Sequence, residues 1–341
     1  MRVERFSLSL STPLSTAHGT IDAREGFVVR VEVGGTGGVG EATPLPGWTE
    51  SLDACEAALE RARRTTDDDW DAALADLDDA PAARHGLALA LADARSRAAD
   101  VPLYRHLGGA PSDRVPVNAT IGDGSPDETV GEARRAVESG FRTLKVKVGT
   151  RAVEADVERL RAVRTAVGPD VALRADANAA WDPSEARRAL PELADVDLAY
   201  LEQPLSSTDL AGHAALRGDV PIALDESLAA HSVAAVVDAG AADRVVLKPM
   251  VLGGPDRARE AALAAREAGI DAVLSTTIDG ALARAGAVHV AASLADPPAA
   301  GLATADRLAT DLIPDPAPVA DGHAHVPKGA GNAPDPGEDS T

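Results

Sequence analysis

The segment TLKVKVG, residues 143–149, places two lysines on one short apolar run. Lysine stands at only four positions of the chain, so all but four of the 33 basic residues are arginine. Residues two apart on a strand face the same side, and Lys145 and Lys147 therefore point together. A lysine amine can release and regain a proton at neutral pH, whereas an arginine guanidinium cannot. The pair indicates a site at which a proton moves.

From residue 115 onward, short apolar runs alternate with helical patterns. This alternation is typical of βα units and a parallel sheet. Eight such runs favour a (β/α)8-type barrel, closed on itself, over an open sheet. The predicted strands are residues 115–121, 143–149, 171–178, 198–204, 221–227, 244–250, 272–277 and 299–304.

The sequence on either side of these units predicts two further regions. Residues 1–110 read as an α+β capping domain, with an antiparallel sheet from runs 3–10 and 26–35, a mobile polar loop between them, and alanine-rich helices from about residue 50. The barrel is expected to span residues 111–305. Residues 306–341 form a C-terminal segment rich in proline, glycine and aspartate, and its last ten residues are expected to be disordered.

Composition limits the setting more than the chemistry. The formal net charge of −21 argues against a nucleic-acid partner, which would need a basic surface. Abundant acid, scarce lysine and 2% aromatic residues suggest a halophilic, salt-filled cytoplasm that screens the repulsion between carboxylates. The single cysteine fits a reducing, cytoplasmic location. No signal-peptide pattern and no membrane-spanning apolar run are seen, so no membrane partner is expected.

Charged residues stand at the ends of the predicted strands, about one βα repeat apart. In barrels of this kind the catalytic groups project from the carboxyl ends of the strands. A single acid at such a place is more often a helix cap. Three together would repel one another unless a cation lay among them, and oxygen ligands suit Mg²⁺, with Mn²⁺ as a substitute. The acids are Asp176, Glu202 and Asp225, and the lysines are Lys145, Lys147 and Lys248.

The order of the motifs KVKV, DANAAW, LEQPL, DES and KP resembles the enolase superfamily, in particular its muconate-lactonising subgroup. The resemblance implies a modified TIM-like barrel, a capping domain in front and a C-terminal segment that returns to the cap. It also implies the roles of the strand-end residues. Asp176, Glu202 and Asp225 would bind Mg²⁺, Lys147 would be the acid/base, Lys248 the opposing lysine and Lys145 its electrostatic neighbour.

The segments REGFVVRVEV and GVGEATPLPGWTESLDACEAAL resemble the capping domain of o-succinylbenzoate synthases, the dehydratases of menaquinone biosynthesis. This implies a Mg²⁺-dependent syn-dehydration of a small carboxylate through an enediolate. Loops 15–25 and 44–50 would close over the substrate. Expected substrate contacts are Gly19, Arg24, Trp48, Asn178, Ser275 and Thr277, with Glu226 and Asp279 behind them. Asp279 stands where the family often has glutamate, a departure at the substrate grip.

Other functions remain open at this point. An N-succinylamino acid racemase or dipeptide epimerase would use the same two lysines on opposite faces of the substrate. A muconate-type cycloisomerase shares the catalytic set. From another class, a non-catalytic binding barrel is disfavoured because drift in so arginine-rich a chain would have replaced the lysines. His323 and His325 are not expected to bind metal, and a homo-oligomer is compatible with the sequence.

Overall fold

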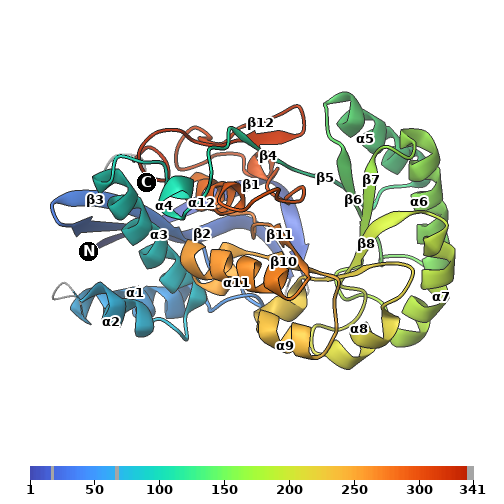
Figure 1. The fold of residues 1–341 in the computed structure, drawn as a ribbon, viewed down its shortest axis with the longest axis horizontal. Helices are drawn as coiled ribbons and strands as arrows, with labels where there is room; N and C mark the ends of the chain where they lie inside the picture. Colours follow the sequence, from blue (N-terminus) through green and yellow to red (C-terminus); the bar gives the residue numbers. More distant parts are fainter. Residues whose placement is uncertain (17–18, 66–68, 336–341) are drawn as a thin grey trace.

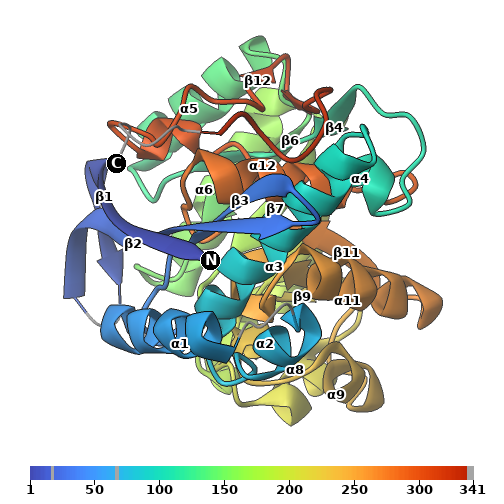
Figure 2. The ribbon, with the colours of Figure 1, turned by 90° about the vertical axis from the view of Figure 1, so that its left-hand side faces the viewer.

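The computed structural model describes residues 1–341 apart from 17–18, 66–68 and 336–341. Its first region is a three-stranded antiparallel sheet in the order β1-β2-β3 (Figures 1 and 2). The strands are β1 Arg2–Thr16, β2 Gly19–Val33 and β3 Thr36–Ala42. Both faces of this sheet are buried, because Phe27, Val29 and Val31 belong to one apolar cluster and Val28 and Val39 to another.

The polar segment expected as a loop between the first two strands is a correction to the sequence prediction. Pairing of β1 with β2 continues through Leu14 with Ile21 and ends at Thr16 with Gly19. Residues 11–13 are exposed, so this end of the hairpin extends beyond the core. Polar composition therefore does not distinguish strand from loop there. The centre of the predicted loop, residues 17–18, lies outside the described residues.

In the described residues of this capping region, the helices are α1 Leu52–Thr65, α2 Trp70–Ala75, α3 Pro81–Ala98 and α4 Leu103–His106. The long helix α3 is buried on most sides, because it lies against the sheet on one face and against barrel helices on another. Glycine allows the close approach: a Cβ at Gly40 would come within 2.1 Å of the Gly86 carbonyl oxygen. Helix α3 therefore packs against both the cap sheet and the barrel helices.

The barrel contains seven parallel strands in the order β11-β10-β9-β8-β7-β6-β5, with helices around them (Figure 1). Helices α5 and α7 each begin with a capping box and a proline in the first turn, which fixes where they start. The elements are β5 Ala119–Ile121, α5 Pro126–Glu138, β6 Thr143–Lys147, α6 Val153–Val167, β7 Ala172–Asp176, α7 Pro183–Ala194, β8 Leu198–Glu202, α8 Leu210–Leu216, β9 Ile222–Leu224, η1 Glu226–Ala229, α9 Val233–Asp238, β10 Arg244–Leu247, α10 Pro249–Leu252, α11 Pro255–Glu267, β11 Asp271–Leu274 and α12 Ala281–Ala292.

The eighth predicted strand, residues 299–304, is present only as two isolated bridges. Ala300 pairs with Val117 and Gly301 pairs with Ser275, both in parallel. These bridges connect the first and last strands, so the barrel closes with an irregular eighth position. The first predicted strand, 115–121, is also divided: β4 Arg114–Pro116 leaves the barrel, and β5 alone joins it. The (β/α)8-type barrel behind an α+β cap is confirmed in this modified form.

The C-terminal segment joins the base of the barrel to the cap. After η2 Ala305–Arg307, strands β12 Val319–Ala320 and β13 His323–His325 form a small sheet with β4. Further on, Asn332 donates its backbone N–H to the buried Asp93 of α3 at 2.6 Å. Gly331 precedes it with φ of 92°, and a Cβ there would meet the same carboxylate at 2.3 Å. None of the helices in the described part of the chain is long and apolar enough to cross a membrane.

Candidate active site

The carboxyl ends of β6 to β10 bring the six predicted charged residues together. Lys147, Asp176 and Glu202 are the last residues of their strands, Asp225 and Lys248 directly follow theirs, and Lys145 is two residues before the end of β6. The parallel register aligns them, because Lys147 is opposite Asp176 and Asp176 is opposite Glu202. The side chains of Asp176, Glu202 and Asp225 are 1%, 0% and 5% exposed.

Lys145 lies deepest among the lysines. Its Nζ is 3.0 Å from Asp176 Oδ2 and 2.9 Å from Glu202 Oε1. Burial by itself favours the neutral amine, but these two carboxylates outweigh it and raise the pKa of Lys145 well above its ordinary value. Lys145 is therefore a permanent cation that ties two buried acids together.

Lys147 is the most exposed of the three lysines, with 34% of its side chain accessible. Its Nζ donates to Asp176 Oδ2 and to Asn178 Oδ1, both at 2.7 Å. A cavity of about 260 Å³ opens beside it, lined also by Asp123, Thr150 and Asn178. Burial opposes ionisation of Asp176, yet Lys145 and Lys147 hold its pKa well below the usual range. Lys147 is the amine that a small molecule in this cavity would meet.

Lys248 directly follows β10, the strand next to β9, and faces Asp225 at the end of β9. Its Nζ lies 2.7 Å from Asp225 Oδ2. Burial nevertheless raises the pKa of Asp225 to about 6, and the neighbouring Glu226 adds to the rise. Burial, reinforced by Asp176, raises the pKa of Glu202 to about 7. Three lysines face three acids here, yet burial still makes the ionised forms of Glu202 and Asp225 unfavourable, and a further cation would favour them.

The donor set fits a divalent metal ion. As they stand, no three acidic, histidine or cysteine side chains among the described residues are grouped closely enough to hold one. Two oxygens, Glu202 Oε2 and Asp225 Oδ1, are nonetheless buried with no hydrogen-bond partner. Buried carboxylate oxygens without partners are costly, and a hard cation such as Mg²⁺ satisfies them. Asp176 shares the ammonium of Lys145 with Glu202.

Gln203 is a site residue that the sequence interpretation did not single out. Its Oε1 accepts the backbone N–H of Asp225 at 3.0 Å and that of Ser227 at 3.2 Å. Its backbone is left-handed, with φ of 40°, a strained conformation for a residue with a side chain. Gln203 thus fixes the turn that presents Asp225. The motif LEQPL contains this glutamine and could have identified it, but the sequence interpretation used only its glutamate.

The predicted supporting residues Asn178 and Glu226 are neighbours. Asn178 Nδ2 donates to Glu226 Oε1 at 3.0 Å, while its Oδ1 accepts from Lys147. Asn178 is also left-handed, with φ of 44°. Burial raises the pKa of Glu226. The hydrogen bonds that connect Lys147, Asn178 and Glu226 orient the lysine amine.

The cap reaches the site through Trp48. Lys248 Nζ lies 3.5 Å from the centre of the indole ring, a close cation–π contact. Arg24, also expected to contact substrate, has a different position: it is 2% exposed and donates to the backbone carbonyls of Thr43, Pro44 and Ile278. Its guanidinium is thus engaged with the protein backbone. Gly19 lies at the end of the β1–β2 hairpin, paired with Thr16.

The loop after β11 carries the remaining predicted contacts. Ser275 is half-buried and donates to the Gly301 carbonyl at 3.3 Å. Thr277 is buried and hydrogen-bonded to Asp279, which is 2% exposed. Glu41, from β3 of the cap, was missed by the sequence interpretation. It is fully buried beside this loop and binds its backbone at Gly280.

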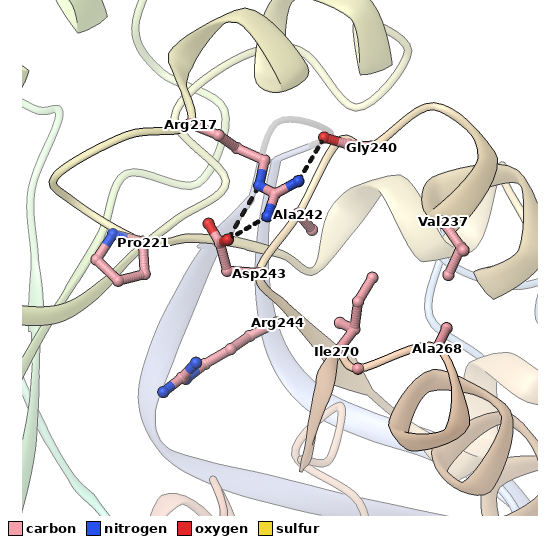
Figure 3. A pocket seen from close by; sticks show the side chains of 10 residues that line it. Arg217, Pro221, Val237, Gly240, Ala242, Asp243, Arg244, Ala268 and Ile270 are labelled. Carbon is pink, nitrogen blue, oxygen red and sulfur yellow. Dashed lines mark hydrogen bonds and ion pairs between the residues drawn. The ribbon is translucent and has the colours of Figure 1, made fainter.

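A different cavity, of about 460 Å³, lies at the opposite end of the barrel (Figure 3). It is found where β9, β10 and β11 begin, lined by Pro221, Arg244 and Ile270 among others. Arg217 there bonds to Asp243 at 2.5 Å and to the Gly240 carbonyl at 3.1 Å (Figure 3). The amino end of such a barrel serves stability rather than catalysis, so the strand-end cluster is the candidate site.

Fold and site together define a class: a capped (β/α)8-type barrel enzyme whose strand ends gather lysines and carboxylates. Residues 128–339 match the family described as "Enolase C-terminal domain-like", and residues 1–94 match "MenC, N-terminal domain". The chain belongs to the enolase superfamily. Enzymes of this superfamily bind Mg²⁺ and act as lyases or isomerases on small molecules, and this chain is likewise an enzyme.

Three similar proteins illustrate the range of activities among relatives of this chain. The L-Ala-D/L-Glu epimerase of Bacillus subtilis is 32% identical over 86% of this chain and 85% of its own. The o-succinylbenzoate synthase of Thermobifida fusca is 42% identical, over 60% of this chain and 64% of its own. The structure of a dipeptide epimerase from Enterococcus faecalis, complexed with Mg and a dipeptide, superposes with a TM-score of 0.86 at 29% identity, covering 97% of this chain and 98% of the other.

Proposed function

We propose that the protein is an o-succinylbenzoate synthase, a Mg²⁺-dependent dehydratase of menaquinone biosynthesis. The observation that carries the proposal is the match of residues 1–94 to the MenC N-terminal domain. That region supplies Trp48, which lies on Lys248 at the mouth of the barrel. The more identical, though shorter, similarity to a synthase supports the same reading.

In the proposed reaction, Lys147 Nζ removes the proton on C1 of 2-succinyl-6-hydroxy-2,4-cyclohexadiene-1-carboxylate. The C6–O bond then breaks, C1 and C6 form a double bond, and Lys147 returns the proton to the departing hydroxyl, which leaves as water. Both transfers use one face of the ring, which a single amine permits. Lys147 must be neutral to accept the proton, and its exposed position beside the cavity lets it exchange protons with solvent.

The other charges stabilise the negative charge that develops on the substrate carboxylate. Lys248 would stabilise this charge from the side of Asp225, and the ammonium of Lys145 favours the ionised forms of Asp176 and Glu202. Asp176, Glu202 and Asp225 would hold Mg²⁺, which, when bound, lowers the energy of a doubly charged enediolate. In this proposal Ser275 and Thr277 would contact the substrate, and Asn178 would orient Lys147 through its hydrogen bond.

A second candidate is an epimerase or racemase of dipeptides or N-succinylamino acids, because the epimerase relative covers more of the chain.

Purified protein with Mg²⁺ in molar KCl should convert the cyclohexadiene to o-succinylbenzoate. The same preparation in D₂O should be offered L-Ala-L-Glu and N-succinylamino acids. Fast exchange of their α-protons with the cyclohexadiene left untouched would replace the synthase by the second candidate. A salt titration of the same activity tests the proposed halophilic origin.

A further inference from the structure

We infer that Glu41 is a positioning residue through which the cap sets the geometry of the substrate-binding loop after β11. The inference rests on the proposed function in one respect, that Ser275 and Thr277 contact the substrate. Glu41 itself lies at the end of β3, fully buried and away from the six strand-end residues. Its effect on catalysis would therefore pass through the loop.

Glu41 caps a helix that belongs to the barrel. Its Oε1 accepts the N–H of Gly280 at 2.7 Å and its Oε2 accepts the N–H of Ala283 at 2.9 Å. These are two of the donors that the first turn of α12 leaves without partners inside the helix. The N-cap residue of α12 is Gly280, which has no side chain to satisfy them. A carboxylate from a strand more than 200 residues away does so instead.

Glycine is required at this N-cap because of Glu41. A Cβ at position 280 would approach Glu41 Oε2 to 2.9 Å and Oε1 to 3.0 Å. The backbone of Gly280 is ordinary, with φ of −67° and ψ of 175°, so an alanine would be tolerated there on conformational grounds. The steric demand comes from the carboxylate alone.

Arg24 and Asp279 complete the connection between cap and loop. Arg24 donates Nε to the Ile278 carbonyl at 3.2 Å and Nη2 to the Thr43 carbonyl at 2.9 Å. Thr43 in turn donates its hydroxyl to Glu41 Oε1 at 2.5 Å. One buried cluster, defined here as Arg24, Glu41, Thr43 and Asp279, thus holds the backbone of the cap loop that leads to Trp48 and the backbone of the barrel loop.

The barrel loop needs such support because its backbone is strained. Ile278 has φ of 61°, and a β-branched side chain in the left-handed region is unfavourable. The residues on either side of Ile278, Thr277 and Asp279, are hydrogen-bonded to each other. Glu41 holds the next residue, Gly280, through its backbone N–H. With Glu41 removed, we expect the loop to relax toward ordinary backbone angles and to move Ser275 and Thr277.

Two variants and a matched control test this inference first. Glu41→Gln keeps size but places an NH₂ group against one of two N–H donors. Gly280→Ala pushes on the same contact from the barrel side. Asp93→Asn is the matched control, because Asp93 is another buried carboxylate, 1% exposed, whose hydrogen-bond partners in the described part of the chain are Val39 at 2.9 Å, Asn332 at 2.6 Å and Arg97 at 2.9 Å, none of them in the loop.

Hydrogen–deuterium exchange of the 277–285 backbone is the readout that needs no substrate. Glu41→Gln and Gly280→Ala should each speed it at least tenfold, while Asp93→Asn should leave it within twofold of wild type. KM should rise about tenfold in the first two variants with kcat within threefold, and the dissociation constant for Mg²⁺ should stay within twofold. Glu41→Asp shortens the side chain and so moves the carboxylate away from position 280. In the Glu41→Asp background, Gly280→Ala should therefore cause no further change in exchange.

The inference is overturned if exchange in 277–285 is the same in Glu41→Gln as in Asp93→Asn, or if Gly280→Ala costs as much beside Glu41→Asp as alone. If the wild type turns over neither the cyclohexadiene nor the dipeptides, the proposed function fails. The exchange measurement and the double variant still decide the role of Glu41, so the two failures are distinct.

Discussion

Replacing Glu202 by glutamine should have opposite effects on stability without and with metal. Burial and Asp176 raise the pKa of Glu202 from 4.5 to about 7 in the metal-free protein. A carboxyl with a raised pKa contributes stability that is complete below about pH 4.5 and is lost as pH rises through about 7. At pH 8 the ionised group therefore destabilises the folded state by about 3 kcal/mol, at 1.36 kcal/mol per pKa unit.

Glu202→Gln removes this cost but weakens the hydrogen bond from Lys145, which is 2.9 Å long. A hydrogen bond between charged groups contributes about 1.5–3 kcal/mol. The metal-free variant should thus be as stable as wild type or up to about 1.5 kcal/mol more stable. Mg²⁺ at 100 times its dissociation constant should then stabilise wild type by about 2.7 kcal/mol and leave the variant nearly unchanged.

The assay is urea unfolding at pH 8 in constant molar KCl, once with EDTA and once with Mg²⁺. Asp93→Asn serves as the control, because it alters a buried carboxylate far along the chain from the strand ends and should keep the full Mg²⁺ response. A Glu202→Gln protein that loses several kcal/mol without metal, yet gains as much from Mg²⁺ as wild type, would refute both the electrostatic reasoning and the ligand assignment.

Three further outcomes are expected. Lys147→Arg should keep the charge but lose about 10²–10⁴ in kcat, whereas Lys328→Arg should not; equal rates would place the proton transfer elsewhere. Trp48→Leu removes the cation–π contact with Lys248, worth about 0.5–2 kcal/mol, and should raise KM several-fold, with Trp48→Phe partly restoring it. Burial lowers the pKa of His289 to about 4, so wild type should lose up to about 3 kcal/mol as pH falls from 6.5 to 4; His289→Gln should lack this loss in urea unfolding.

The strand-end residues were predictable because the barrel converts sequence spacing into geometry. One charged position per βα repeat suffices to place Lys147, Asp176 and Glu202 side by side, and the register of β6, β7 and β8 agrees. Because lysine is scarce and arginine is common in this chain, the few lysines indicated which cations belong to the candidate site. No packing detail was needed for either step.

Other parts depend on contacts that spacing does not encode. Glu41 looks like an exposed acid in a polar, glycine-rich strand, and only the approach of α12 makes it a buried cap. Arg24 reads as a substrate ligand until the cap loop and Ile278 supply carbonyl partners. Residues 299–304 have a strand-like pattern, yet only Ala300 and Gly301 pair, because a complete ladder is not required to close the barrel.

The contact between the C-terminal segment and α3 can form only late in biosynthesis. Asp93 Oδ1 receives its hydrogen bond from Asn332, which is 239 residues later in the chain. At about 5–20 residues per second, a ribosome needs on the order of 10–50 s to span that interval. Throughout this time the nascent cap holds a carboxylate that the finished protein buries, and β4 lacks its partner β13. A chain that stops before residue 331 therefore lacks this hydrogen bond and should unfold at lower urea concentration, although every proposed catalytic side chain is present.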